Sequence, residues 1–125
     1  MPLLNTLNGP IIAMGQHTSG VLDLGTDYIV GMIMPEEWTP AVVSVLVSPD
    51  GDNFFDLHDF HGGPVMFNVE PGTIVAIDPH WLMMARYLQL RSGTADDPVP
   101  QAKTRNFRTI GTMQLTTLTN DPTRR

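Results

Sequence analysis

The chain has 125 residues, the length of one domain, which is enough to bury a hydrophobic core. Hydrophobic residues make up 42% of it, which excludes a disordered chain, and the absence of cysteine excludes disulfides, thiolate metal sites and a cysteine nucleophile. Glycine and proline, with 11 residues each, favour an all-β fold with many turns over a helix bundle.

The net charge of −6 repels nucleic acid, so we expect no nucleic-acid partner. No apolar run approaches the roughly 18 residues that a membrane span needs, so we expect no membrane partner either. The segment Met1–Thr6 lacks the basic start and apolar core of a signal peptide. The expectation is a soluble protein made in the cytoplasm.

The first segment, residues 1–18, is interrupted by asparagine, glycine and proline. We expect an extended N-terminal arm there, with one short strand at Ile11–Met14. A short strand is predicted from Ser19 to Leu24. The next run, Tyr28–Met34, is apolar on both faces, which is typical of a central strand covered on both sides. Pro35 ends it.

The strongest local signal is a β-hairpin. The β-branched run Val42–Val47 leads into a Pro-Asp-Gly turn at residues 49–51, and the aromatic run Phe54–Leu57 follows. Alternating apolar residues predict further strands at Val65–Val69, Thr73–Ile77, Tyr87–Arg91 and Phe107–Leu118.

Asp78 and Pro79 have the residue types of a helix cap and a first helical residue, so we expect one short helical turn near residues 79–84. Residues 92–102, rich in proline and aspartate, predict a long exposed loop. Together, these predicted elements indicate an all-β fold, a jelly-roll-like antiparallel β-sandwich. It is expected to span residues 19–118, between the arm of residues 1–18 and a C-terminal tail of residues 119–125.

No motif for catalysis is present: no serine lies in a Gly-x-Ser-x-Gly pattern, and no glycine-rich phosphate loop exists. The sequence therefore predicts that the protein is not an enzyme and has neither catalytic residues nor a cofactor. Asp56, His58, Asp59 and His61 could together ligate zinc or manganese, but they follow no known ligand spacing. We predict no metal site and interpret these four as solvated loop residues.

Asp50, Asp52 and Asn53 have two interpretations. They could hold a surface calcium ion, or they could form an Asp-Gly turn whose carboxylate accepts hydrogen bonds from local backbone amides. Trp38 and Trp81, each close to acidic residues in the sequence, also have two interpretations. An exposed indole can stack on a sugar or contact a partner, whereas a buried one plugs an end of the sandwich.

Charge is unevenly distributed along the chain. Residues 1–102 hold 12 of the 13 acidic residues and two of the seven basic ones, whereas residues 103–125 are net basic. A basic end beside an acidic body favours contacts between copies of the protein or with an acidic partner. The alternative is a solvated tail.

Part of the chain, from about residue 38 to residue 92, resembles the discoidin (coagulation-factor C-domain) pattern. The resemblance lies in Trp38, the Ser-Pro-Asp-Gly turn at residues 48–51, the run Phe54–Leu57 and the strand Arg86–Arg91. It implies a jelly-roll sandwich whose end loops bind sugars, lipid head groups or proteins. On this resemblance, the alternative function is a carbohydrate-binding module for cell-surface glycan.

A larger part of the chain is similar to small virion proteins of tailed phages. The similar segments are Ser19–Gly25, Val30–Trp38, Ile77–Pro79, Arg86–Thr94 and Pro98–Ala102. This resemblance implies a homo-oligomeric structural protein on the capsid exterior, either a decoration (cement) protein that stabilises contacts between capsid subunits or the base of a head fibre.

The expected partners are then the major capsid protein and copies of the chain itself. The basic residues Arg124 and Arg125 are the candidate capsid contacts.

Overall fold

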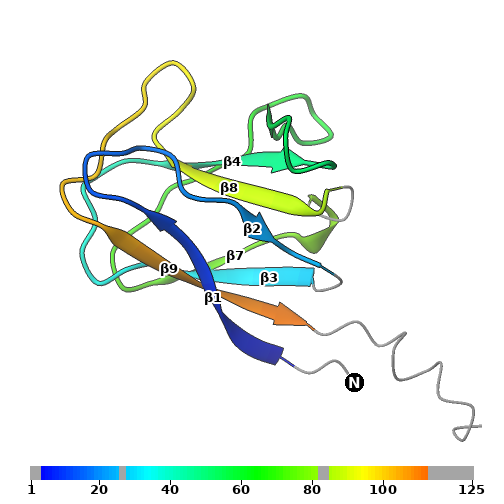
Figure 1. Ribbon diagram of the computed structural model, residues 1–125, viewed down its shortest axis with the longest axis horizontal. Helices are drawn as coiled ribbons and strands as arrows, with labels where there is room; N and C mark the ends of the chain where they lie inside the picture. Colours follow the sequence, from blue (N-terminus) through cyan, green and yellow to red (C-terminus); the bar gives the residue numbers. More distant parts are fainter. Residues whose placement is uncertain (1–3, 26–27, 82–84, 113–125) are drawn as a thin grey trace, which may run out of the picture.

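The computed structural model describes residues 4–25, 28–81 and 85–112 (Figure 1). Within these ranges the chain is all-β, and its strands form two antiparallel sheets. Their bounds are β1 Leu4–Ile12, β2 Leu22–Asp23, β3 Tyr28–Ile33, β4 Val43–Ser48, β5 Phe55–Asp56, β6 Met66–Phe67, β7 Ile74–Ala76, β8 Tyr87–Ser92 and β9 Arg105–Thr112, with a 3-10 turn η1 at Pro79–Trp81. None of the described helical segments is long and apolar enough to cross a membrane.

The first sheet has the strand order β1-β9-β3-β7, so the last strand in the sequence lies between two earlier ones. β3 pairs with β9 on one side and with β7 on the other, which confirms the predicted central strand. Ile29 and Met32 of β3 are buried. In β7, Val75 packs against the core while Ile74 is exposed, as the predicted alternation requires.

The second sheet has the order β2-β8-β4, and β4's remaining flank is shared by two short strands, β5 and β6. β4 and β5 form the predicted hairpin, with Val47 opposite Phe55. Leu88 and Leu90 of β8 point inward and are buried, also as predicted. In Figure 1 the layer of β4 and β8 lies above the layer of β3 and β9.

The core fills the space between the two layers. Its largest fully buried side chains include Phe107, Ile12, Ile29, Met32 and Leu90. Trp38 packs edge-on against Phe107, with ring centroids 5.5 Å apart and an interplanar angle of 72°. This geometry is one that aromatic pairs favour, and it joins the loop before β4 to the centre of β9.

The structure differs from the sequence prediction at the ends of the chain. The strand predicted at Ile11–Met14 lies earlier and is longer: β1 covers Leu4–Ile12 and pairs with β9 along its length, with a bulge between Asn8 and Ile11. The last strand begins at Arg105 rather than Phe107. Its predicted continuation beyond Thr112 and the tail of residues 119–125 lie outside the described residues.

Of two further connections, one has the predicted helical turn and the other is more ordered than predicted. The helical turn is the 3-10 turn at Pro79–Trp81, and residues 82–84 lie outside the described part. The segment of residues 92–102 is not an open loop throughout. It is pinched by a bridge between Gly93 and Pro98, and Gln101 near its end is buried.

Candidate functional site

A polar cluster lies on the outer face of the second sheet. Ser44 of β4 and Arg91 of β8 are directly opposite each other in the register, and their neighbours Val45 and Leu90 point into the core. Because side chains alternate along a strand, Ser44 and Arg91 therefore point away from the core. Asp56 of β5 joins them on this face.

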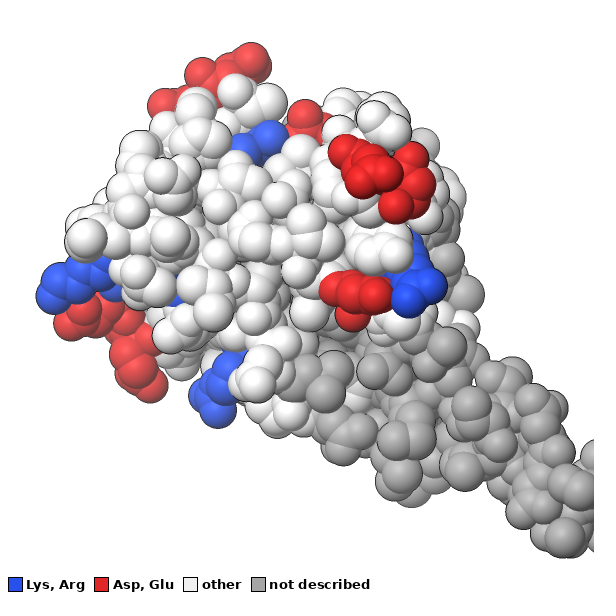
Figure 2. All heavy atoms as spheres, in the orientation of Figure 1, with Lys and Arg blue, Asp and Glu red and all other residues white. Residues whose placement is uncertain are grey.

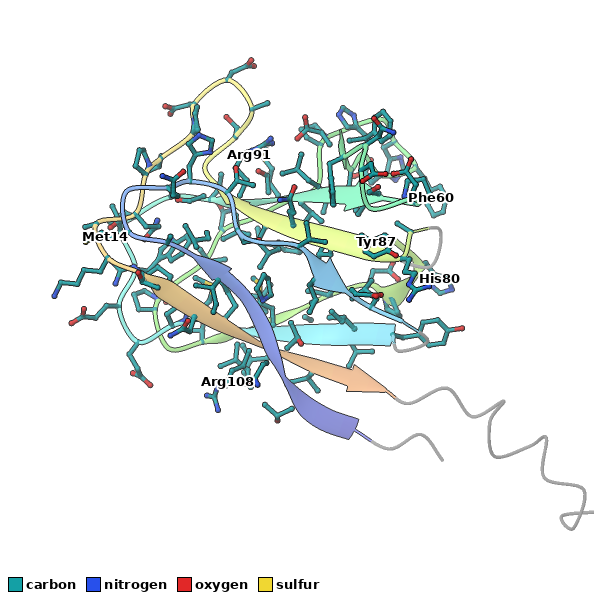
Figure 3. All side chains as sticks on the ribbon, in the orientation of Figure 1. Met14, Phe60, His80, Tyr87, Arg91 and Arg108 are labelled. Atoms are coloured by element: carbon teal, nitrogen blue, oxygen red, sulfur yellow. The ribbon has the colours of Figure 1, made fainter. Side chains whose placement is uncertain are left out.

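Arg91 is buried, with 9% of its surface exposed, although it lies on the outer face. Its Nε donates a hydrogen bond to Ser44 Oγ at 3.0 Å, and one terminal nitrogen donates to an Asp56 carboxylate oxygen. Ser44 Oγ in turn donates to the Gly93 carbonyl at 2.7 Å. These charge-assisted bonds hold the guanidinium in one orientation. Figure 3 shows Arg91 at the base of the loop that follows β8.

A cavity of about 340 Å³ opens above this cluster. The loop after β8 contributes Thr94, Ala95 and Asp96 to its lining, and Pro64 and Met66 contribute to it from around the start of β6. The polar groups that line it are Ser44, Asp56, His58, Arg91, Thr94 and Asp96. Small-molecule sites are concave and combine apolar surface with a few polar groups, and the lining of this cavity includes both kinds of residue.

His58 and Asp59 build the loop beside the cavity. His58 Nδ1 lies 2.9 Å from the Gly62 carbonyl oxygen, which can only accept, so in the neutral ring Nδ1 carries the hydrogen and Nε2 is an acceptor. One Asp59 carboxylate oxygen accepts hydrogen bonds from the backbone N–H groups of His61 and Gly63. In the described ranges no three His, Asp or Glu side chains come together as a metal-binding group.

The same loop carries the most exposed aromatic residue of the described chain, Phe60, 92% of whose surface is open to solvent (Figure 3). Backbone bonds close the loop: Gly62 N–H donates to Asp59 O at 3.0 Å, and Asp59 N–H donates to Gly63 O at 2.9 Å. Phe60 is therefore presented by a loop that has a defined shape before any partner binds.

Two more apolar side chains are exposed on the strands that flank this loop. Phe55 of β5 is 60% exposed and Met66 of β6 is 45% exposed. We call Phe55, Phe60 and Met66 the β5–β6 edge surface. Figure 2 shows that acidic side chains form several separate groups on the visible face and that uncharged surface lies between them.

Residues 50–53 form the predicted Asp-Gly turn, in which the Asp50 carboxylate accepts hydrogen bonds from local backbone amides. The Asp50 carboxylate accepts hydrogen bonds from the backbone N–H groups of Asn53 and Asp52, from the Asn53 side-chain amide and from Ser48 Oγ. These bonds lower the pKa of Asp50 well below its ordinary value, the Asn53 backbone contributing most. The carboxylate is thus engaged by the turn itself.

The remaining predicted site residues lie elsewhere. Trp38 is 7% exposed, and its Nε1 donates to the Ala41 carbonyl at 3.0 Å, which agrees with its interpretation as a buried plug of the sandwich. Trp81 ends the 3-10 turn, and its side chain is outside the described part, as are Arg124 and Arg125.

The sequence analysis missed Ser44 and Arg91. It assigned Asp56 and His58 to a loop cluster, because only the register of β4, β5 and β8 brings them beside Arg91. The signal that could have revealed this cluster is an arginine, Arg91, in an alternating apolar strand, together with a serine, Ser44, in the strand that pairs with it.

Comparison with known proteins found no match: no family model, no curated protein and no solved structure matches this chain.

Proposed function

We propose that the protein is a phage virion structural protein, a capsid decoration (cement) protein that binds the capsid exterior and stabilises contacts between capsid subunits. The observation that carries this proposal is Phe60, almost fully exposed on a loop closed by its own hydrogen bonds. Aromatic residues are the commonest anchors of protein interfaces. A loop that is already ordered loses little conformational entropy when it docks.

The β5–β6 edge surface is suited to a neighbouring subunit with an apolar pocket. Phe55 and Met66 are further exposed apolar side chains beside this loop, on opposite faces of the sheet, because Phe55 is opposite the core residue Val47 and Met66 is opposite the outward-facing Ser44. Asp52 and Asp59 add negative charge in the turn before β5 and the loop after it. The complementary surface would be an apolar pocket with basic residues at its rim. Such contacts are individually weak, but copies arranged by capsid symmetry act together.

The described strands form two antiparallel sheets, and we propose that the body is a jelly-roll-like sandwich. A stiff two-layer body suits a protein that joins capsid subunits, because it transmits load between them. Arg124 and Arg125 are proposed as further contacts, to acidic groups on the major capsid protein or on another copy of the chain. These partners are the ones implied by the resemblance of short segments, such as Ser19–Gly25 and Arg86–Thr94, to small virion proteins of tailed phages.

The test is binding to purified capsids that lack the protein. The wild-type chain is expected to saturate at a copy number fixed by capsid symmetry and to raise the capsid melting temperature. The Phe60→Ala variant is expected to bind about tenfold more weakly or worse, as for an interface anchor. Ile74→Ala is the matched control, because Ile74 is an exposed apolar residue of β7 in the other sheet.

Two results would contradict the proposal. One is a wild-type chain that does not bind capsids at any concentration. The other is a Phe60→Ala variant that binds as tightly as Ile74→Ala and the wild type, which would remove the β5–β6 edge surface from the interface. Equal melting temperatures of the three free proteins would show that the substitutions leave the fold intact.

A further inference from the structure

The cavity around Arg91 has a balance of charge that restricts what it can bind. Arg91 is paired with Asp56, and Asp96 adds a second carboxylate at the exposed rim. An anionic ligand would meet two carboxylates, and a cationic ligand would meet the buried guanidinium. A neutral ligand that can both donate and accept hydrogen bonds suits this combination best, and hydroxyl groups have that capacity.

The polar groups of the cavity retain free hydrogen-bonding capacity. Arg91 uses Nε and one terminal nitrogen, and no group in the described ranges bonds its other terminal nitrogen. Asp56 gives one carboxylate oxygen to Arg91, while its second oxygen has no partner in the same ranges. The orientation of the His58 ring leaves Nε2 as an acceptor. Arg91, Asp56 and His58 all line the same cavity.

Part of the lining of the cavity is apolar. Pro64 and Met66 offer C–H surface rather than hydrogen bonds, and Val65 between them is buried in the core. A pyranose ring has the matching construction, with hydroxyl groups at its rim and C–H groups on its faces. The cavity volume of about 340 Å³ lies at the small end of the range for ligand sites, about 300–1,000 Å³, which suits a single sugar residue.

We infer that this cavity is a binding site for a neutral hydroxyl-rich ligand, a single residue of a glycan, in contact with the Arg91–Asp56 pair and with the apolar side chains of Pro64 and Met66. The pair is already fixed by Ser44, so binding requires little rearrangement of the protein. Asp96 and His58 add further hydrogen-bonding groups to the lining. Met66 lines this cavity and is also part of the β5–β6 edge surface, so the two proposed sites adjoin. Phe60 does not line the cavity and Asp96 is not part of that surface, so variants of these two residues test the sites separately.

The experiment is a titration of the isotopically labelled full chain, followed by amide chemical shifts. The probes are a panel of neutral monosaccharides, with inorganic phosphate as the anionic arm and arginine amide as the cationic arm. At least one neutral sugar is expected to shift the amides of Thr94, Ala95 and Asp96 in a saturable way. Phosphate and arginine amide are expected to leave these amides unchanged.

Two variants test the assignment of the polar groups. Asp56→Asn and Asp96→Asn keep the shape of each side chain but remove its charge, and each is expected to weaken sugar binding about tenfold. Asp96 has no structural hydrogen bond in the described part, so its variant is expected to fold even if Asp56→Asn does not. Asp97→Asn is the matched control, because Asp97 follows Asp96 but does not line the cavity.

The inference is overturned if no neutral sugar of the panel shifts the loop amides, if phosphate or arginine amide does so instead, or if Asp96→Asn binds the sugar as tightly as Asp97→Asn. The Phe60→Ala variant is expected to bind the sugar normally, and Asp96→Asn is expected to bind capsids normally. Failure of one proposal therefore leaves the other intact.

Discussion

Gln101 Nε2 donates a 2.7 Å hydrogen bond to Ser92 Oγ, and both side chains are fully buried. The same amide donates to the Thr39 carbonyl at 3.1 Å, while Gln101 Oε1 accepts from Thr39 N–H and from Arg105 Nε, each at 3.0 Å. One side chain thus joins the end of β8, the start of β9 and the loop before β4. A buried polar network is stabilising when every member is satisfied, as here.

Replacement of Gln101 by alanine is expected to lower the free energy of unfolding by about 3 kcal/mol, because the buried Arg105 Nε and the Thr39 backbone lose their partners. Urea unfolding measures this loss. Gln16→Ala is the control: Gln16 is exposed, and its loss is expected within about 0.5 kcal/mol. Equal losses in the two variants would mean that the network contributes nothing beyond an ordinary glutamine.

Gly62 and Gly93 both have positive φ, but only at Gly93 would an added Cβ also overlap neighbouring atoms. Alanine substitutions at the two positions therefore distinguish the cost of backbone strain alone from the cost of strain plus steric overlap. Gly62 has φ +83°, and a Cβ at this position would point into open space, so Gly62→Ala is expected to cost about 1–2 kcal/mol of strain. Gly93 has φ +90°, and a Cβ there would overlap the Asp97 carbonyl oxygen and lie 2.8 Å from Val99 N. Gly93→Ala is therefore expected to cost more. Thermal unfolding of both variants decides the order, and a Gly62 variant that is the less stable of the two would contradict it.

Trp38 is expected to be one of the most sensitive core positions. Trp38→Ala removes the edge-on contact with Phe107 and leaves a cavity, for an expected loss of about 3–5 kcal/mol. Trp38→Phe keeps an aromatic ring but loses the hydrogen bond to Ala41, so its loss is expected to be smaller. Urea unfolding of both variants checks this order. A loss below about 1 kcal/mol for Trp38→Ala would show that the indole is not part of the core.

The Asp50 turn predicts a specific acid sensitivity. The pKa of Asp50 is lower in the folded chain than its ordinary value of 3.8, so the bonds to its carboxylate stabilise the fold above about pH 4. That stability is lost as the pH falls below 3.8 toward the folded-state pKa. The pKa values of Asp23 and Asp78 are also lowered, through hydrogen bonds from Arg86 and from the backbone of His80 respectively, and act in the same direction.

The measurement is the unfolding free energy of the wild type and of Asp50→Asn between pH 5 and pH 2. The variant is expected to be less stable at pH 5 and to lose less stability on acidification. Asp52→Asn serves as control, since in this turn Asp52 contributes its backbone N–H to the Asp50 carboxylate. Parallel pH profiles for all three proteins would show that the Asp50 carboxylate is not responsible.

Much of the fold could be predicted because local patterns coincide with tertiary structure. The run that became β4 is β-branched and followed by a Pro-Asp-Gly turn, so both the strand and its hairpin partner were readable. Tyr28–Ile33 is apolar on both faces, and the structure places it between β9 and β7, with Ile29 and Met32 buried and its other apolar side chains half-buried. In these places the local apolar pattern agrees with the burial.

β1 was misplaced because its residues include Asn8, Gly9 and Pro10, which locally favour a break. The structure accommodates them with a bulge, and a Cβ at Gly9 would lie 2.6 Å from the Phe107 carbonyl oxygen, so glycine permits the close approach of the two strands. The Arg91 cavity could not be predicted for a related reason. Its residues come from three strands, and strand register is not encoded in any one of them.

The position of β9 has a consequence for how the chain folds during its synthesis. β1 and β3 are synthesised first, yet the strand that separates and pairs with both is made last. Until Arg105–Thr112 has left the ribosome, each of these earlier segments exposes an unsatisfied ladder edge, which is a template for association with other nascent chains. Premature termination ahead of Arg105 should therefore yield sticky, insoluble fragments rather than a smaller folded body.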